Sequence, residues 1–399
     1  MVGSESKAPA PVVRTVTDRA VHAFSLVEAW LFSEPMAELL AAFHEQSSDR
    51  PSQGQGSQSA PSWLHLQEEL PDWLHLIFNE NSARIRGLSA SQQDTLRRAL
   101  AIEQQAAASF NFRTSDSGQY RERSQAITAN FDDDLRSLVL KLADRLGLVS
   151  PSPTRFEDYK NTLIMGGGYR SPLLRTRYSA LLQDTGIGLG ELSFLGSPRF
   201  LIEEPAERPE TDKYAPGAVD EFDLMRGAAH SEFGLLSSEI EFLCGCSSTS
   251  VICPRWRHGG KDGADRTPPA YTHERRANLI DAGGQRRGSA LSASTSRPPY
   301  RPHTADTFAL WARCSDPQPD QHTLVVTTQV FVPFQMFDAI RQLYLSHGID
   351  INAVGFGADW GDRPQTAEYL LQETLSAIRS GRRLLVDAAE MLMGPTTVV

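Results

Sequence analysis

The spacing of apolar side chains divides the chain into two parts. In the first 150 residues, apolar positions recur every three or four residues, which is the period of an amphipathic helix. A segment near residues 46–61 breaks this pattern because it is rich in Ser, Gln, Gly and Pro. We therefore predict an all-α N-terminal region over residues 1–150 with a disordered loop near 46–61. The helical pattern is clearest in the segments 21–46, 91–110 and 131–149.

From residue 151 to 399, short apolar runs alternate with helical stretches. This order is typical of βαβ units, in which right-handed crossovers produce a mostly parallel sheet. We predict an α/β fold for this part: a mostly parallel Rossmann-like sheet with helices on both faces. The strands are expected near residues 161–167, 191–196, 289–294, 323–328 and 351–357. The helices are expected near residues 172–184, 218–233, 304–313, 333–346 and 364–392.

A loop insertion is expected near residues 246–288, where this alternation is lost. Residues 246–302 contain nine arginines and one lysine against four acids, although the whole chain has a formal net charge of −10. A solvent-exposed loop explains this composition. A basic flap over an anionic ligand is the second interpretation, and the sequence leaves both open.

Composition narrows the function classes. Of the 399 residues, 40% are hydrophobic and 22% are charged, which is ordinary for a globular protein. The acidic balance disfavours nucleic-acid binding, which requires a concentrated basic surface. The sequence has no run of about 18 apolar residues and no signal-peptide core, so we expect a cytoplasmic protein with no membrane partner. Composition does not determine the oligomeric state.

Three glycines follow the first predicted strand. Gly166, Gly167 and Gly168 precede Arg170 and Ser171, and a proline comes next. Serine at an N-cap with proline at the first helical position favours a helix start, and glycines allow backbone N–H groups to approach an anion. The spacing matches neither the dinucleotide-binding fingerprint nor the Walker loop. A tight turn without a ligand is the alternative explanation.

Polar residues also follow the next three predicted strands. Arg199 comes after the second strand, Thr304 is expected to cap a helix after the third, and Thr328 ends the fourth. Because the carboxyl ends of parallel strands meet at one edge of a sheet, we expect these side chains to lie together. Guanidinium groups and helix N-termini both bind phosphate or carboxylate. The predicted ligand-binding set is Gly166, Gly167, Gly168, Arg170, Ser171, Arg199, Glu203, Thr304 and Thr328.

Two residues near this edge are candidate catalytic groups. Glu221 opens the helix after the second strand and could act as an acid or base. His303 precedes a helix start and has a side chain that titrates near neutral pH. Each also has a structural explanation, because carboxylates at helix starts interact with the helix dipole and histidines are common in polar loops.

The four cysteines are too few for a disulfide scaffold. Cys244, Cys246 and Cys253, together with His258 and Cys314, could be arranged as zinc ligands. The C-x-C-x6-C spacing lacks the second C-x-x-C pair of common zinc sites. We therefore expect reduced, buried or idle thiols and no metal site.

Five segments together resemble the SanA/YdcF-like (ElyC/SanA/YdcF) family of Rossmann-like domains, closest to its uncharacterised actinobacterial members. The resemblance covers residues 159–358 and implies a ligand pocket at the strand ends, with Glu221 in the family's acidic position. It also implies S-adenosylmethionine as one possible ligand, since at least one soluble member binds it. The segments depart from the family where His303–Thr307 replace Asn-Thr-x-Glu-Asn and where the His and Arg after the fourth strand are missing. The five segments are LIMGGG, LGSPR, VDEFDLM, RPHTADTF and LVVTTQVFVPFQMFDAIRQL.

These patterns predict an enzyme, a transferase or hydrolase, that binds a small anionic ligand at the carboxyl ends of the strands. The expected ligand is phosphorylated, nucleotide-like or S-adenosylmethionine-like, and specialised metabolism is the expected setting. The alternative is a non-catalytic module that senses a metabolite or binds another protein. The sequence alone leaves both functions open.

Overall fold

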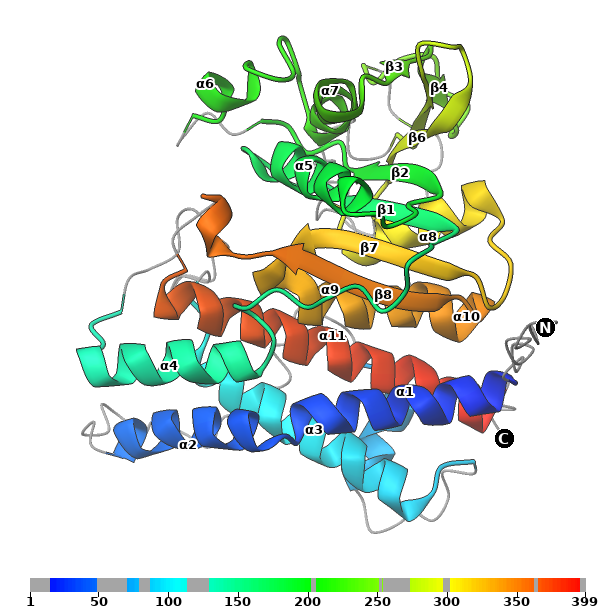
Figure 1. Ribbon diagram of the computed structural model, residues 1–399. Helices are drawn as coiled ribbons and strands as arrows, with labels where there is room; N and C mark the ends of the chain where they lie inside the picture. Colours follow the sequence, from blue (N-terminus) through cyan, green and yellow to red (C-terminus); the bar gives the residue numbers. More distant parts are fainter. Residues whose placement is uncertain are drawn as a thin grey trace, which may run out of the picture.

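The computed structural model confirms an α/β fold preceded by a helical region (Figure 1). The expected loop near 46–61 lies outside the described residues, except for residues 46–48, which end a helix. The described residues are 15–48, 70–78, 87–112, 129–201, 206–250, 253, 273–296, 302–361 and 365–394.

The helices of the N-terminal region begin at the capping residues that the sequence favours. Asp132 accepts a hydrogen bond from the backbone N–H of Leu135, and two further aspartates occupy the first turn of that helix. Thr15 and Ser89 each form a reciprocal capping box. The elements are α1 (Val16–Leu31), α2 (Glu34–Ser48), the 3-10 helix η2 (Asp72–Phe78), α3 (Ala90–Ser109) and α4 (Asp133–Arg145).

All five predicted strands are present and lie side by side in parallel. The described strands form an eight-stranded sheet with the order β3-β5-β6-β2-β1-β7-β8, and β4 pairs with β5. β1 pairs with β2 on one side and with β7 on the other, so the chain changes direction across the sheet at β1. The parallel strands are β1 (Asn161–Met165), β2 (Glu191–Gly196), β6 (Arg286–Ser292), β7 (His322–Thr328) and β8 (Asp350–Phe356).

The predicted insertion near 246–288 is partly wrong, because it contains a strand. β5 (Arg275–Ile280) pairs antiparallel with β6, and alternate residues of β5 are buried. Two short strands, β3 (Leu236–Ser237) and β4 (Glu241–Phe242), pair with β5. Residues 254–272 of the expected insertion lie outside the described residues.

Each face of the sheet has its own hydrophobic core, since successive strand residues point to opposite faces. Ile164 and Phe194 belong to the core under α5 (Ser171–Asp184) and α7 (Glu221–Phe233). Leu163, Met165 and Leu195 belong to the opposite core. That core is covered by α8 (Thr304–Ser315) and by α9 (Val332–Ala339), which continues through a π-helical turn, η8 (Ile340–Tyr344), into α10 (Leu345–His347).

A third core joins the N-terminal helices to the α/β part. It contains buried residues of α1, α3 and α4 together with residues of α9 and of the long helix α11 (Ala367–Met393). α11 lies between the sheet and the N-terminal helices and packs against both α1 and α9 (Figure 1). The N-terminal helices α1–α4, which together with η2 we call the helical layer, are therefore anchored to α11 near the C-terminal end of the chain.

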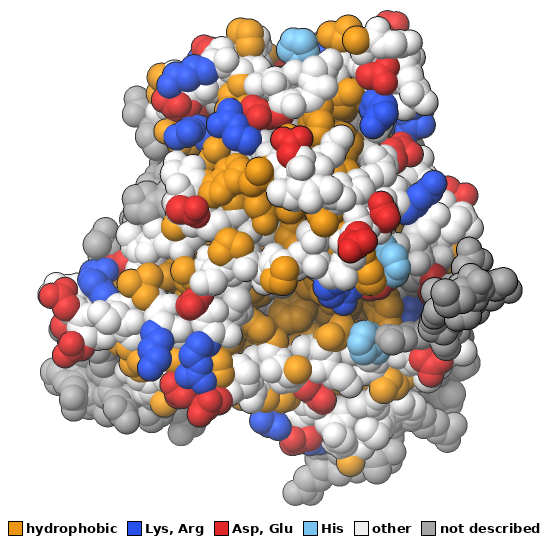
Figure 2. All heavy atoms as spheres, viewed as in Figure 1, with side chains coloured by type: hydrophobic (Ala, Val, Ile, Leu, Met, Phe, Trp, Pro, Cys, Tyr) orange, Lys and Arg blue, Asp and Glu red, His pale blue; other side chains and the backbone are white. Residues whose placement is uncertain are grey.

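The surface mixes apolar and charged side chains. In Figure 2, Lys and Arg side chains lie next to Asp and Glu side chains, and apolar side chains gather across the middle of the same face. Within the part of the chain that the structure describes, every helix is too short or too polar to span a bilayer.

Glu103 of α3 provides a test of how the helical layer is held. Its carboxylate is buried and lies 2.9 Å from Nε of Arg382 and 3.6 Å from Nε of Arg379, both on α11. Replacing Glu103 by Ala leaves these arginines without that carboxylate, so the free energy of unfolding should fall by roughly 3–5 kcal/mol. Urea denaturation followed by circular dichroism measures this change.

The matched control is Glu34→Ala, because Glu34 pairs with Arg145 at 2.6 Å but its side chain is 76% exposed. Its loss should change the free energy of unfolding by less than about 1 kcal/mol. Equal effects of the two substitutions would contradict the importance of the buried α3–α11 contact.

Candidate functional site

The carboxyl ends of β1 and β7 form the point where a ligand is expected in an open parallel sheet. The two strands are neighbours in the sheet. After β1 the chain first builds β2, β5 and β6 on one side of β1, and it then crosses back to form β7 on the other side. Ligands of such sheets bind outside this switch point. In Figure 1 the strand ends point to the left, toward α6 (Arg208–Thr211) and the 3-10 helix η9 (Ala358–Trp360).

The glycines after β1 are required by close packing against the next strand. Gly166 donates its N–H to the carbonyl of Leu195 at 2.6 Å, and a Cβ on Gly166 would collide with that carbonyl. A Cβ on Gly168 would collide with the Arg199 guanidinium and the Glu207 carboxylate. The next residue, Tyr169, has φ of 59°, a conformation that side chains other than glycine rarely adopt. The turn is therefore tightly constrained whether or not a ligand binds there.

The start of α5 differs from the prediction by one residue. Arg170 occupies the N-cap position and makes no side-chain capping bond, while Ser171 is the first helical residue. Ser171 therefore does not cap the helix, because the strained Tyr169 turn already brings Arg170 into helical geometry. The Arg170 guanidinium reaches across the strand edge to the carbonyl of Gly361 at 3.4 Å.

Arg175 lies at the switch point, although the sequence pattern did not single it out. Its side chain is 2% exposed and extends from α5 back toward the strands. Nη1 donates to the carbonyls of Met165, at 3.0 Å, and Gly166. Nε and Nη2 each lie 3.4 Å from Oγ1 of the buried Thr328. A usable signal was present, since Arg175 follows Ser171 by one helical turn and so shares its face.

Arg199 is buried between two carboxylates. Its Nε donates to Glu221 at 2.7 Å, and its Nη2 lies 3.3 Å from both carboxylate oxygens of Glu207. Ser197 donates its hydroxyl to Glu221 at 2.6 Å. We call Arg199, Glu207, Glu221 and Ser197 the Arg199 cluster.

Within the Arg199 cluster, two carboxylates face a single guanidinium, which gives a formal charge of −1. Burial by itself lowers the pKa of Arg199, but the charges of Glu221 and then Glu207 outweigh it and raise that pKa above its usual range. Arg199 is therefore not a freely available cation, because two ion pairs already hold it. Its Nη1 is different: among the described residues this buried donor has no hydrogen-bond partner.

A second buried ion pair ties the neighbouring helix to the sheet. Asp220 caps α7 by accepting the N–H of Asp223 at 3.2 Å, and its carboxylate lies 2.5 Å from Nη2 of Arg275 on β5. Burial raises the pKa of Asp220 to about 6, and the charge of Arg275 opposes this rise. This pair fixes the start of α7, and therefore the position of Glu221.

The predicted N-cap of the helix after β6 is wrong by one residue. His303, not Thr304, is the N-cap of α8: its Nδ1 accepts the N–H of Asp306 at 3.3 Å, and Asp306 accepts the N–H of His303 at 2.9 Å. Thr304 is the first helical residue. The imidazole of His303 therefore has a capping role, which competes with the predicted catalytic one. Glu203 lies outside the described residues.

The structure thus brings together one part of the predicted set. Gly166–Gly168, Arg199 and Glu221 are in contact, and Thr328 meets the turn through Arg175. Thr304 starts the helix after β6, the strand next to β2, and among the described residues it makes no side-chain hydrogen bond to this group.

Three of the cysteines also lie together, away from the switch point. Cys244, Cys246 and Cys253 surround His273, and their four potential ligand atoms are all within 4.8 Å of one another. All four cysteines are free thiols, and Cys253 is buried, but the sequence did not predict the grouping of these three with His273. Cys314 does not belong to the group, and His258 lies outside the described residues.

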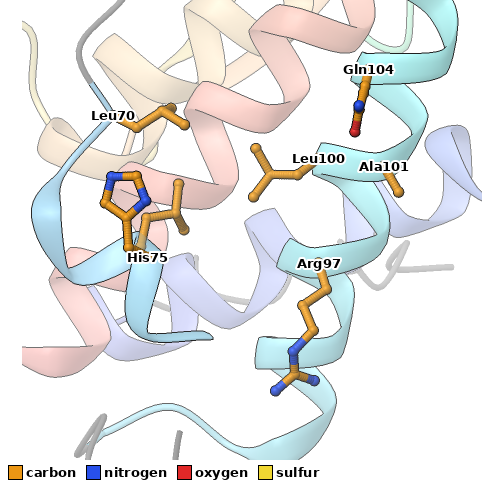
Figure 3. A pocket seen from close by; sticks show the side chains of 7 residues that line it. Leu70, His75, Arg97, Leu100, Ala101 and Gln104 are labelled. Atoms are coloured by element: carbon orange, nitrogen blue, oxygen red, sulfur yellow. The ribbon is translucent and has the colours of Figure 1, made fainter. Parts of the chain in front are cut away.

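A hollow of about 80 Å³ is present in the helical layer, between η2 and α3 (Figure 3). Leu70, Leu74 and Leu100 give it an apolar wall, and His75, Arg97 and Gln104 lie at its margin. Arg97 donates to the carbonyl of Ile77 at 2.6 Å, so its position is fixed by η2. None of these residues lies at the carboxyl ends of the strands. The hollow is therefore distinct from the predicted ligand site.

Three mycobacterial proteins are similar to this chain. Uncharacterized protein Rv3785 and uncharacterized protein MT3893, both of Mycobacterium tuberculosis, and uncharacterized protein Mb3814 of Mycobacterium bovis are each 32% identical to it over 265 residues. The match covers 64% of this chain and 68% of each relative. No family model and no solved structure matches the chain.

Gly168 tests the packing of the turn against the Arg199 cluster. Gly168→Ala should displace Arg199 from Glu207 and lower the free energy of unfolding by about 3 kcal/mol, the cost of disrupting a buried ion pair. Gly283→Ala is the control, since Gly283 lies in an exposed turn and should change stability by less than about 0.5 kcal/mol. Indistinguishable urea midpoints for the two variants would refute this account of the turn.

Proposed function

This chain belongs to the same family as the mycobacterial proteins Rv3785, MT3893 and Mb3814, and we propose that it binds a small anionic molecule at the β1–β7 switch point. The proposed site consists of the glycine turn, the partly exposed Arg170 and the buried Arg199 cluster behind them. The ligand class that fits is a phosphorylated or nucleotide-like molecule, with S-adenosylmethionine as a further candidate from the resemblance to the SanA/YdcF-like family.

The unpartnered Nη1 of Arg199 is the main support for this proposal. Leaving a buried donor of a charged group unsatisfied costs about 1–3 kcal/mol or more, so a hydrogen-bond acceptor at this atom would stabilise the site. Glu207 and Glu221 hold the other nitrogens in fixed positions. Because Nη1 is itself buried, a ligand oxygen that completes the hydrogen bonds of this guanidinium must enter beside the glycine turn and displace the side chains that cover it.

Arginines on both sides of the glycine turn supply the positive charge. Arg199 is balanced by two glutamates, so the ligand's charge must be met mainly by Arg170 and Arg175. Arg170 is partly exposed at the start of α5, where the helix dipole also favours an anion. Guanidinium groups suit phosphate and carboxylate because they donate two parallel hydrogen bonds.

An enzymatic role for this site assigns proton transfer to Glu221. Its carboxylate accepts hydrogen bonds from both Arg199 and Ser197, which hold it in one orientation. A carboxylate in that state can accept a proton from a bound hydroxyl or water. The reaction class that follows is a group transfer or hydrolysis on an anionic small molecule. His303 takes no part in it, because its imidazole caps α8.

A second candidate function, metabolite sensing without catalysis, is favoured by one contact. Gln329 directly follows β7 at the strand edge, and its Nε2 donates to the carbonyl of Gly147 in the helical layer at 2.7 Å. The same segment contributes Phe331 to the core that includes α11. A ligand that shifts Thr328 would therefore act on the helical layer, which could pass the change to a partner protein.

A ligand screen by thermal shift tests the proposed site. Nucleotides, sugar phosphates and S-adenosylmethionine are added singly to the purified protein, and a ligand at 100 times its Kd should stabilise the fold by roughly 2.7 kcal/mol. Arg170→Ala should weaken binding of that ligand by about 10-fold or more, because it removes a charge-assisted hydrogen bond. Isothermal titration calorimetry measures the change.

Arg177→Ala is the matched control. Arg177 is on the same helix and half-exposed, but it pairs with Glu232 on α7 and faces away from the strand edge. Its loss removes the same charge and should leave affinity within about 2-fold of the parent protein. Equal losses in both variants would mean that the ligand responds only to overall charge, and the proposed site would be wrong.

Turnover separates the two candidate functions. We expect the ligand found in the screen to be consumed by the parent protein and not by Glu221→Gln, which keeps the size of the side chain but cannot accept a proton. Mass spectrometry of the incubated ligand measures this. Binding without turnover in the parent protein would favour the sensor.

A further inference from the structure

The ends of β4 and β5 bring cysteine and histidine side chains face to face. Glu241 pairs with Arg276 and Phe242 with Arg275, and the N–H of Leu243 then donates to the carbonyl of Glu274 at 2.8 Å. Continuing this antiparallel register places Cys244 opposite His273. Their Sγ and Nδ1 atoms are 3.4 Å apart.

A glycine turn and a returning segment add the other two thiols. Gly245, with φ of 82°, donates its N–H to the carbonyl of Phe242 at 3.0 Å, and this turn separates Cys244 from Cys246. Cys253 then returns to the same place and is fully buried, as is His273. Phe242 packs edge-on against the His273 ring at 5.9 Å and so restricts its orientation.

The separations fit four ligands around one metal ion. In a tetrahedral zinc site, with Zn–S of about 2.3 Å and Zn–N of about 2.0–2.1 Å, neighbouring ligand atoms lie about 3.6–3.8 Å apart. Here the four atoms are all within 4.8 Å of one another. The ligands of an iron–sulfur cluster are divided between different irons and so lie further apart.

We propose that Cys244, Cys246, Cys253 and His273 bind one Zn²⁺ ion in a structural Cys3His site. Three thiolates and one imidazole are a ligand set that zinc prefers, and four protein ligands leave no open position for substrate. The site is independent of the anion-binding function proposed above. Its ligands come from both sides of residues 254–272, so the ion ties the two ends of that segment together.

The ion also holds a strand that positions the Arg199 cluster. His273 precedes β5 by two residues, and Arg275 at the start of β5 pairs with Asp220 at the start of α7. Glu221, the residue after Asp220, pairs with Arg199. Loss of the ion frees the end of β5, and the fold should become less stable there first.

Metal analysis of the purified full-length protein tests the proposal. The protein is expressed in zinc-supplemented medium without a metal-binding tag, dialysed, and analysed by inductively coupled plasma mass spectrometry. We expect about one zinc per chain in the parent protein, and at least a 100-fold weaker zinc affinity in Cys253→Ser and His273→Ala, more than the 10–100-fold loss caused by outer-shell changes. Cys314→Ser is the control and should keep its zinc, because Cys314 is outside the group.

Two further measurements guard against variants that simply misfold. His273→Cys supplies a fourth thiolate and should retain zinc where His273→Ala does not. In the parent protein, replacing zinc by Co²⁺ should give the thiolate-to-cobalt absorption of a tetrahedral sulfur-rich site. The proposal is overturned if the zinc-reconstituted parent protein binds no zinc, if it instead holds iron or copper, if Cys253→Ser binds zinc as tightly as the parent, or if these cysteines form a disulfide.

Discussion

The buried guanidinium of Arg199 is the constraint on which the strand edge depends. A charge with 5% of its residue surface exposed must be paired, and Glu207 and Glu221 meet that need from two different segments. Gly168 has no side chain because the guanidinium occupies the space where a Cβ would lie. The glycine turn, the start of α7 and the loop before α6 are therefore placed by one ion cluster. The same cluster leaves Nη1 buried, with no hydrogen-bond partner among the described residues.

A second set of contacts connects this edge to the rest of the molecule. Asp220 and Arg275 join α7 to β5, and the thiol and imidazole groups at the start of β5 lie at the outer end of the same strand. On the other side, Gln329 joins the end of β7 to the helical layer. The proposed ligand site is thus connected to the proposed metal centre through Arg275 of β5 and to the helical layer through Gln329.

Some of the candidate site could be predicted from sequence, and the rest depended on contacts between distant segments. Gly166–Gly168, Arg199 and Glu221 were selected because they follow strands, and parallel strands place such residues at one edge. The ion pairs of Arg199 with two glutamates showed that it is not a free cation. One of these glutamates, Glu207, follows no strand and caps no predicted helix, so the sequence did not point to it. Arg175 was missed because an arginine inside a helix is usually solvent-exposed, and only the packing of α5 on β1 buries it.

The sequence by itself determined the five parallel strands and the main helices. Periods of 3.6 and 2 in the apolar pattern, and caps such as Asp132, fix helices and strands through local backbone and burial preferences. The apolar pattern did not reveal β5 because its first two residues are arginines, and their burial and pairing are provided by Asp220 and Glu241. Only the tertiary structure decided that His273, which comes 20 residues after Cys253, joins the three cysteines. Strand register places such residues together, and no spacing rule along the chain contains that information.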